Sequence, residues 1–108
     1  MIYLASPYSA PSESLEKLRF QQTRDFVAKQ LRDGYVLFSP IVYCHQFKID
    51  FGFAGDADFW AEFNLAILHR AKQLWVLQLT GWEQSRGVQN ELAWAKALDI
   101  PVIYRSPE

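Results

Sequence analysis

The chain has only one cysteine, Cys44, and no long apolar run among its 108 residues. A lone cysteine excludes an internal disulfide and any zinc site built from several cysteines, and it fits a reducing compartment. The start, MIYLASPYS, has too short an apolar stretch for a signal peptide, and no stretch approaches the length that spans a membrane. We therefore expect a soluble, cytoplasmic protein.

The chain also lacks an excess of either charge. Eleven Lys and Arg residues against twelve Asp and Glu residues leave a formal charge of −1. No sequence-wide field would draw such a protein to an anionic membrane or to a nucleic-acid backbone, so a polymeric nucleic-acid partner is not expected. Because neither His-x-x-x-His nor Cys-x-x-Cys occurs, the sequence predicts no metal site, and no cofactor is expected.

Aromatic residues, in contrast, are plentiful. Eight Phe, five Tyr and four Trp occur in a chain whose length fits a single domain over residues 1–108. Aromatic side chains usually form core, subunit interface or pocket wall. A domain this small would gain from a neighbour that closes its site, so we expect a homo-oligomer.

Four short apolar stretches alternate with three longer helical patterns along the chain. The helical patterns follow Ser12, Asp56 and Ser85, each of which is a residue type that caps the start of a helix. Residues 33–34, Asp-Gly, end the first pattern. The apolar stretches, which predict strands, cover residues 2–5, 35–38, 74–79 and 100–104.

This alternation implies parallel strands, right-handed crossovers and helices on both faces of a sheet. The predicted fold class is a small doubly wound, Rossmann-like α/β domain with strand order 2-1-3-4. In such sheets, ligands bind beyond the carboxyl ends of the strands where the order reverses, here at residues 6–9 and 80–87. Residues 41–55 have no clear period, and we expect an ordered loop there that folds over something.

One carboxylate, Glu91, lies on the side of the third helix that Val88 and Ala95 predict to be apolar. The alternative is a solvent-facing carboxylate favoured by the helix dipole. Gly87 lies one turn earlier, and an interior glycine costs about 1 kcal/mol relative to alanine, which suggests that something approaches the backbone closely. The start of this helix is therefore the candidate site.

Two motifs resemble the nucleoside 2-deoxyribosyltransferase-like superfamily. They are YLASPY at residues 3–8, on the first strand, and SRGVQNELAWA at residues 85–95, on the third helix. The resemblance covers nearly the whole chain in the same order. It implies that Glu91 is the nucleophile that attacks the sugar C1′ atom of a nucleoside or nucleotide, and that a hydrogen bond from Tyr3 helps to keep Glu91 ionised. A plain core role is the alternative for Tyr3.

Ser85 carries information about the substrate. Members that transfer deoxyribose between free nucleosides usually have an acid at this place, whereas relatives that hydrolyse nucleoside 5′-monophosphates have Ser-x-Gly. A hydroxyl and the N–H groups of a helix start bind phosphate, which a carboxylate would repel, although Ser85 also reads as a simple N-cap. Ser6 and Ser9 would complete an anion cradle, and His45 would reach the mouth of the crevice. The predicted substrate-binding residues are Ser6, Tyr8, Ser9, His45, Ser85 and Gly87.

One position departs from the superfamily pattern. An Asp on the second helix helps to deliver a proton to the leaving base in the superfamily, and the corresponding residue here is Asn64. A carboxamide can hydrogen-bond a base but cannot act as a general acid. Asp58 is the first candidate for the missing general acid. The alternative is that Asp58 only stabilises the helix, as an acidic residue in its first turn that interacts with the helix dipole. The predicted catalytic residues are therefore Glu91, Tyr3, Asn64 and Asp58.

The function expected from these residues is hydrolysis of the base–sugar bond of a nucleoside 5′-monophosphate, with the 2′-deoxy form favoured, by an N-glycosidase that uses Glu91 as its nucleophile. A 2-deoxyribosyltransferase is the near alternative. A non-catalytic nucleotide-binding module is the second alternative, because Asn64 replaces an acid. Trp60, Trp82 and Phe59 are candidates for stacking on a base, with core or dimer contact as the alternative.

Overall fold

The computed structural model describes residues 1–53 and 57–108. At its centre is a sheet of four strands in the order β2-β1-β3-β4, and every pair of neighbouring strands is parallel. This arrangement confirms the predicted α/β fold class and strand order. The strands are β1 (Ile2–Ala5), β2 (Leu37–Phe38), β3 (Gln73–Leu77) and β4 (Val102–Arg105).

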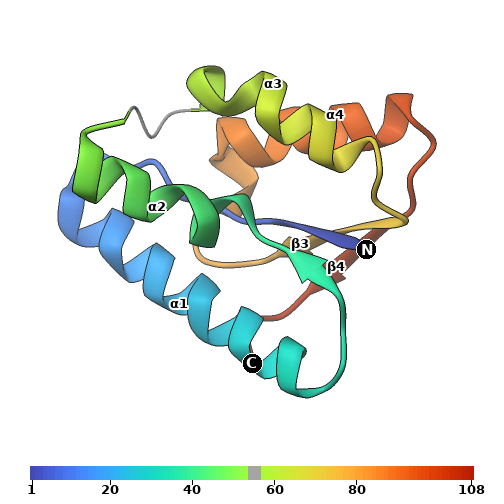
Figure 1. Cartoon of the computed structure of the whole chain (residues 1–108), viewed down its shortest axis with the longest axis horizontal. Helices are drawn as coiled ribbons and strands as arrows, with labels where there is room; N and C mark the ends of the chain where they lie inside the picture. Colours follow the sequence, from blue (N-terminus) through green and yellow to red (C-terminus); the bar gives the residue numbers. More distant parts are fainter. Residues whose placement is uncertain (54–56) are drawn as a thin grey trace.

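Helices cover both faces of this sheet, as Figure 1 shows. One layer contains α1 and α2, which contact each other, and the other contains α3 and α4. None of the helices in the described parts of the chain is long and apolar enough to cross a membrane. The helices are α1 (Glu13–Arg32), α2 (Pro40–Phe51), α3 (Ala57–Leu68) and α4 (Arg86–Ala97), with a short 3-10 helix η1 (Trp82–Gln84) before α4.

Two of the three predicted helix caps are present. The Ser12 hydroxyl accepts a hydrogen bond from the Leu15 N–H at 3.2 Å, and the Ser85 hydroxyl accepts one from the Val88 N–H at 3.3 Å. Each bond satisfies a backbone donor that the first turn of a helix leaves without a partner. The third predicted cap, Asp56, lies outside the described residues.

Helix α2 corrects the prediction of an irregular loop over residues 41–55. The Ser39 hydroxyl caps this helix by accepting from the Val42 N–H at 3.2 Å, Pro40 lies in its first turn, and Gly52 ends it with a φ of 70°. These start and stop signals are in the sequence, but the helical period is not. Residues 54 and 55 of the predicted loop are not among the described residues.

The period is missing because apolar side chains lie on several faces of α2. Val42 packs against the core beneath the helix, whereas Tyr43, Ile49 and Phe51 are exposed. An amphipathic pattern arises only where one face alone is apolar. The periodic pattern therefore failed to predict a helix whose apolar side chains are partly exposed.

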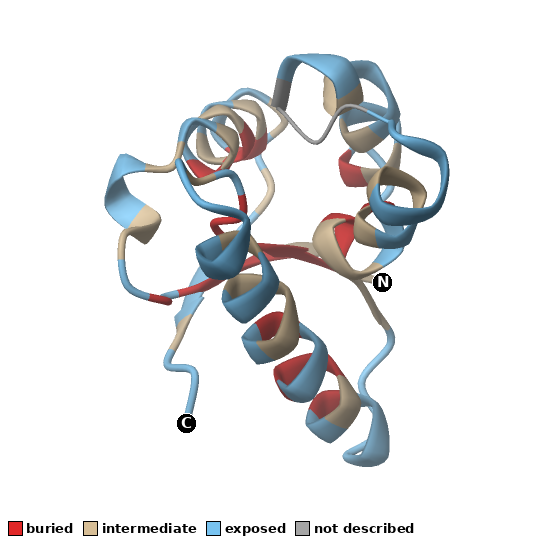
Figure 2. Ribbon diagram, turned by 90° about the vertical axis from the view of Figure 1, so that its left-hand side faces the viewer, coloured by how far each residue is buried: buried red, intermediate tan, exposed pale blue. Residues whose placement is uncertain are grey.

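The core consists of two clusters, one on each face of the sheet, and Figure 2 shows the buried residues on the strands and on the inner faces of the helices. Successive side chains of a strand point to opposite faces. Accordingly, Tyr3 and Ala5 belong to the cluster with Val88 of α4, and Leu4 belongs to the cluster with Phe26 of α1. This alternation directs the Tyr3 side chain toward α4.

Candidate functional site

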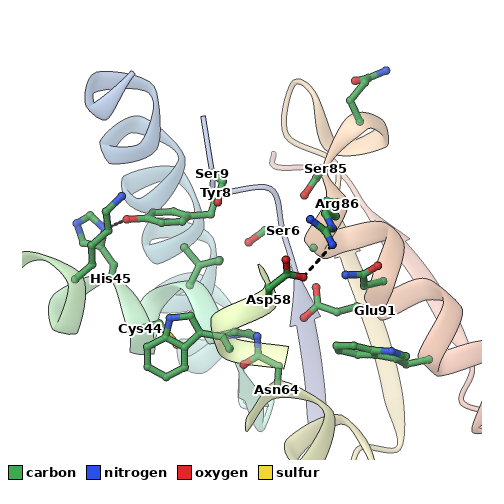
Figure 3. Close-up of a pocket in the computed structure, with 18 residues that line it drawn as sticks. Ser6, Tyr8, Ser9, Cys44, His45, Asp58, Asn64, Ser85, Arg86 and Glu91 are labelled. Carbon is green, nitrogen blue, oxygen red and sulfur yellow. Dashed lines mark hydrogen bonds and ion pairs between the residues drawn. The ribbon is translucent and has the colours of Figure 1, made fainter. Parts of the chain in front are cut away.

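A cavity of about 330 Å³ opens beyond the carboxyl ends of β1 and β3. It is bordered by the loop that follows β1, by α2, by α3 and by the first turns of α4 (Figure 3). The strand order reverses at this place, so the cavity lies where the topology predicts a ligand site. Its size is within the range of small-molecule sites, about 300–1,000 Å³.

The predicted site residues come together around this cavity. All of them except Tyr3 border it, and Tyr3 lies fully buried in the core and donates a hydrogen bond to Glu91. The residues that border the cavity are Glu91, Asn64, Asp58, Ser6, Tyr8, Ser9, His45, Ser85 and Gly87.

Glu91 lies on the buried side of α4, together with Val88 and Ala95. Only 6% of Glu91 is exposed, so the alternative of a solvent-facing carboxylate is wrong. Burial raises the pKa of Glu91 to about 8, and the hydrogen bond from Tyr3 opposes this effect without cancelling it. The hydrogen bond from Tyr3 thus favours the carboxylate, as the sequence predicts, but burial has the larger effect and keeps the pKa of Glu91 above its ordinary value.

Tyr3 combines the two roles that the sequence left open. It is a fully buried core residue, and its hydroxyl donates to Oε2 of Glu91. Burial raises the pKa of Tyr3 above its usual value, and the neighbouring Glu91 raises it further. Tyr3 thus stays neutral and remains a hydrogen-bond donor to the carboxylate.

The start of α4 presents polar groups to the cavity. The Ser85 oxygen caps the helix at Val88, which leaves its hydroxyl hydrogen able to bond a ligand. Gly87, in the first turn, also borders the cavity. Backbone N–H groups at a helix start favour an anion, and a residue without a side chain lets the anion approach.

Asp58 and Arg86 form an ion pair between α3 and α4, with a distance of 3.0 Å from Arg86 Nη2 to Asp58 Oδ1 (Figure 3). Both side chains are mostly exposed, at 66% for Asp58 and 72% for Arg86, and exposed pairs of this kind contribute little stability. In this arrangement one oxygen of the Asp58 carboxylate is paired with the Arg86 guanidinium group, and Asp58 also borders the cavity. A role of Asp58 as an acid stays a prediction.

Asn64 has an unfilled hydrogen-bonding capacity. Its Oδ1 atom is buried and has no hydrogen-bond partner among the described residues, and the side chain borders the cavity from α3. A buried polar atom without a partner costs free energy. A ligand N–H group in the cavity would remove this cost.

Helix α2 supplies the wall opposite α4. The Tyr8 hydroxyl is 2.7 Å from Nδ1 of His45, and the His45 ring stacks on Phe20 with centroids 4.0 Å apart. Burial lowers the pKa of His45, with a smaller effect of the same sign from Lys48, so the ring is neutral at pH 7. His45 therefore borders the cavity from a helix, instead of from the predicted loop.

Sequence reasoning missed Lys48, Asn90 and Trp94, which also border the cavity. Lys48 pairs with Glu16 of α1, with 2.5 Å between Nζ and Oε1. Asn90 and Trp94 follow Gly87 at steps of three and four residues, as expected for one face of a helix. The spacing from Gly87 could have identified Asn90 and Trp94 as cavity residues. Lys48 could not be identified in this way, because its segment was not predicted to be helical.

Cys44 also borders the cavity, but its thiol is unreactive. Burial raises the pKa of Cys44 to about 12, and the charge of Glu91 adds to the effect. A thiol with so high a pKa holds its proton and is a poor nucleophile. In residues 1–53 and 57–108, no group of three or more His, Cys, Asp or Glu side chains is placed to hold a metal ion.

Comparison with known protein families gives one match. Residues 1–106 fit the model of a family described as "Domain of unknown function (DUF1937)". The chain belongs to the DUF1937 family. No curated protein matches the sequence. The family description names no activity, so the chemistry of this DUF1937 domain has to be argued from its site.

Proposed function

We propose that this DUF1937 domain is an N-glycosidase that hydrolyses the base–sugar bond of a nucleoside 5′-monophosphate, preferably the 2′-deoxy form. The observation that carries the proposal is the buried Glu91 carboxyl group, which borders the cavity and accepts a hydrogen bond from Tyr3. The resemblance of residues 3–8 and 85–95 to the nucleoside 2-deoxyribosyltransferase-like superfamily supports it.

The chemistry needs a carboxylate beside the sugar C1′ atom. When the C1′–N bond breaks, C1′ takes on oxocarbenium character, and a carboxylate stabilises this charge or bonds to it. In the proposed reaction, the ionised form of Glu91, reached by loss of its proton to water, bonds to C1′ while the C1′–N bond breaks, and the base leaves with the electron pair and takes up a proton from water. A second water molecule then attacks C1′, the bond to Glu91 breaks and that water loses a proton, which releases the sugar phosphate and restores the Glu91 carboxylate.

The start of α4 is the proposed phosphate subsite. Ser85 offers its hydroxyl hydrogen, and the N–H groups of the first turn carry the positive end of the helix dipole. Gly87 leaves room for the phosphate oxygens. Ser6 and Ser9 border the same cavity from the loop after β1 and would donate from the other side.

The base would lie between α2 and α3. There, the unpaired Oδ1 atom of Asn64 would accept a hydrogen bond from an N–H group of the base, and the Trp60 ring also borders the cavity. Neither residue can donate a proton as an acid. The proposed enzyme is therefore slower than one with an acid at position 64, or it acts on a base that leaves easily.

A non-catalytic nucleotide-binding module is the second candidate. Two observations favour it: Asn64 replaces an acid, and Asp58 is engaged by Arg86. Calorimetric binding of a nucleotide without base release would select this candidate. A transferase would differ from the hydrolase by forming a new nucleoside when a second free base is supplied.

We also propose that the domain is a homo-oligomer. Exposed aromatic side chains gather on α2 and α3, among them Tyr43, Phe51, Phe59 and Phe63. Monomeric proteins rarely expose large contiguous apolar patches. Sedimentation that shows a monomer at micromolar concentration would contradict this proposal.

The test is a search for free base. The wild-type protein is incubated with a panel of nucleosides and of ribo- and deoxyribonucleoside 5′-monophosphates, and the products are separated by chromatography. Glu91→Ala should abolish release, whereas Glu62→Ala should not, because Glu62 is an exposed carboxylate of α3. The proposal fails if the wild type releases no base, or if Glu91→Ala releases as much as the wild type.

A further inference from the structure

Arg19 of α1 connects the two loops that lead away from the central strands. Its Nη1 atom donates to the carbonyl oxygen of Ser9 at 2.8 Å and to that of Tyr8 at 3.5 Å, on the loop after β1. Its Nη2 atom donates to the carbonyl oxygen of Thr80 at 3.3 Å, on the loop after β3. One guanidinium group thus bridges both sides of the point where the strand order reverses.

Gly81 provides the space for this bridge. A Cβ atom at Gly81 would lie 2.7 Å from Nη2 of Arg19, so the end of the Arg19 side chain would have to shift. Gly81 also has a φ of +88°, which side-chain-bearing residues rarely adopt. A side chain at this position would therefore move the guanidinium group from its place between the loops.

The partners of the half-buried Arg19 are unusual for an arginine. None of the ion pairs found in the described residues includes Arg19, and its buried Nε atom has no hydrogen-bond partner there. Its donors bond backbone carbonyls alone. An unsatisfied buried donor is costly, so a residue needed only for packing would be better replaced by an apolar one.

Neighbouring residues on the same face of α1 hold the rest of the first loop. The Thr23 hydroxyl donates to the Arg19 carbonyl at 2.8 Å and is 3.4 Å from the Ser6 hydroxyl. A Glu16 carboxylate oxygen accepts from the Ala10 N–H at 3.2 Å. Because Glu16, Arg19 and Thr23 are spaced by three and four residues, one polar stripe of α1 faces residues 6–10.

We propose that Arg19 is a positioning residue that holds the two loops at the cavity in register for ligand binding. The first loop carries Ser6 and Ser9, and the second leads through η1 to Ser85. Without the bridge, these serine side chains would no longer face each other at a constant distance. Glu91 would keep its place, since it lies within α4 and is bonded to Tyr3.

The kinetic part of the test rests on the proposed glycosidase function. Arg19→Met should raise KM for a nucleoside 5′-monophosphate by about tenfold or more and change kcat by less than about threefold, because binding is lost while the reacting carboxyl group stays in place. Arg19→Lys should recover part of the loss, since an ammonium group can reach one carbonyl but not both loops. Arg24→Met is the matched control, because Arg24 is an exposed arginine of the same helix that pairs with Asp25.

A second pair of variants tests the bridge without removing the arginine. Gly81→Ala should displace Nη2 of Arg19 and raise KM, whereas Gly34→Ala should not. Gly34 has nearly the same φ, +91°, but nothing lies within 4 Å of its added Cβ atom. Both variants therefore place an alanine at a similar positive φ, and the contact with Arg19 occurs in only one of them.

Amide hydrogen exchange without any nucleotide separates this proposal from the proposed function. Arg19→Met should speed exchange at the hydrogen-bonded amides of Ala10 and Trp82, which donate to Glu16 and to the Leu79 carbonyl, by about tenfold or more relative to wild type and Arg24→Met. If the wild type releases no base, the glycosidase function fails, and the exchange rates still decide the role of Arg19. Unchanged exchange in Arg19→Met overturns the proposal, as does an equal rise of KM in Gly81→Ala and Gly34→Ala. If Arg19→Met does not fold, exchange in Gly81→Ala and Arg19→Lys decides in the same way.

Discussion

The buried carboxyl group of Glu91 should make the protein less stable as the pH rises. Its pKa is about 8 in the folded protein, against an ordinary value of 4.5. Between these values, the folded protein keeps a proton that the unfolded chain has released, so the free energy of unfolding falls with increasing pH. The contribution of Glu91 is present in full below about pH 4.5 and is lost as the pH rises through about 8.

The size of this effect follows from the pKa difference. One pH unit corresponds to about 1.4 kcal/mol, so a pKa of about 8 against 4.5 gives an upper limit of about 5 kcal/mol. Because only 6% of Glu91 is exposed, screening by solvent reduces this figure little. A loss of a few kcal/mol is large beside the total stability of a domain, which is about 5–15 kcal/mol.

The assay is urea unfolding at several pH values between 5 and 9. Glu91→Gln keeps the size of the side chain and an oxygen that can accept from Tyr3, but it cannot ionise. The wild type should lose a few kcal/mol relative to Glu91→Gln across this range, whereas Glu62→Gln should follow the wild type. Titration of all other groups cancels in the difference. Parallel curves for the wild type and Glu91→Gln would refute the reasoning.

Three further predictions concern the proposed reaction. Tyr3→Phe removes a hydrogen bond to a charged group, worth about 1.5–3 kcal/mol, so kcat should fall about 10- to 100-fold. Because that bond lowers the pKa of Glu91, the rise of kcat/KM with pH should also move to higher pH. An unchanged pH profile would contradict this. Asn64→Asp should raise base release by about tenfold or more, since a carboxyl group can protonate the leaving base, and equal single-turnover rates would argue against it. Ser85→Asp keeps a helix cap but repels phosphate, so kcat/KM should fall for 5′-monophosphates and stay unchanged for free nucleosides. An equal fall of kcat/KM for both kinds of substrate would exclude a phosphate subsite at Ser85.

Local patterns in the sequence were enough for much of the fold. Each predicted strand was found within two residues of its expected bounds at either end, because parallel central strands are short apolar runs bounded by turn residues. The predicted strand order rested on parallel strands, right-handed crossovers and helices on both faces of the sheet taken together. Helix α2 was not predicted, because the segment between its capping residues has apolar side chains on several faces and so lacks a helical period.

The sequence by itself also predicted the inner side of a helix for Glu91, from its spacing to Val88 and Ala95, and only the structure removed the alternative of a solvent-facing carboxylate. The direction in which its pKa shifts was decided by the tertiary structure, because desolvation depends on every group that surrounds the carboxylate. Long-range packing likewise decided that Asp58 pairs with Arg86. The bridge from Arg19 to Thr80 joins residues that are 61 positions apart, and no local pattern encodes such a contact. Secondary structure follows from neighbours along the chain, whereas the charge state and alignment of this site follow from neighbours in space.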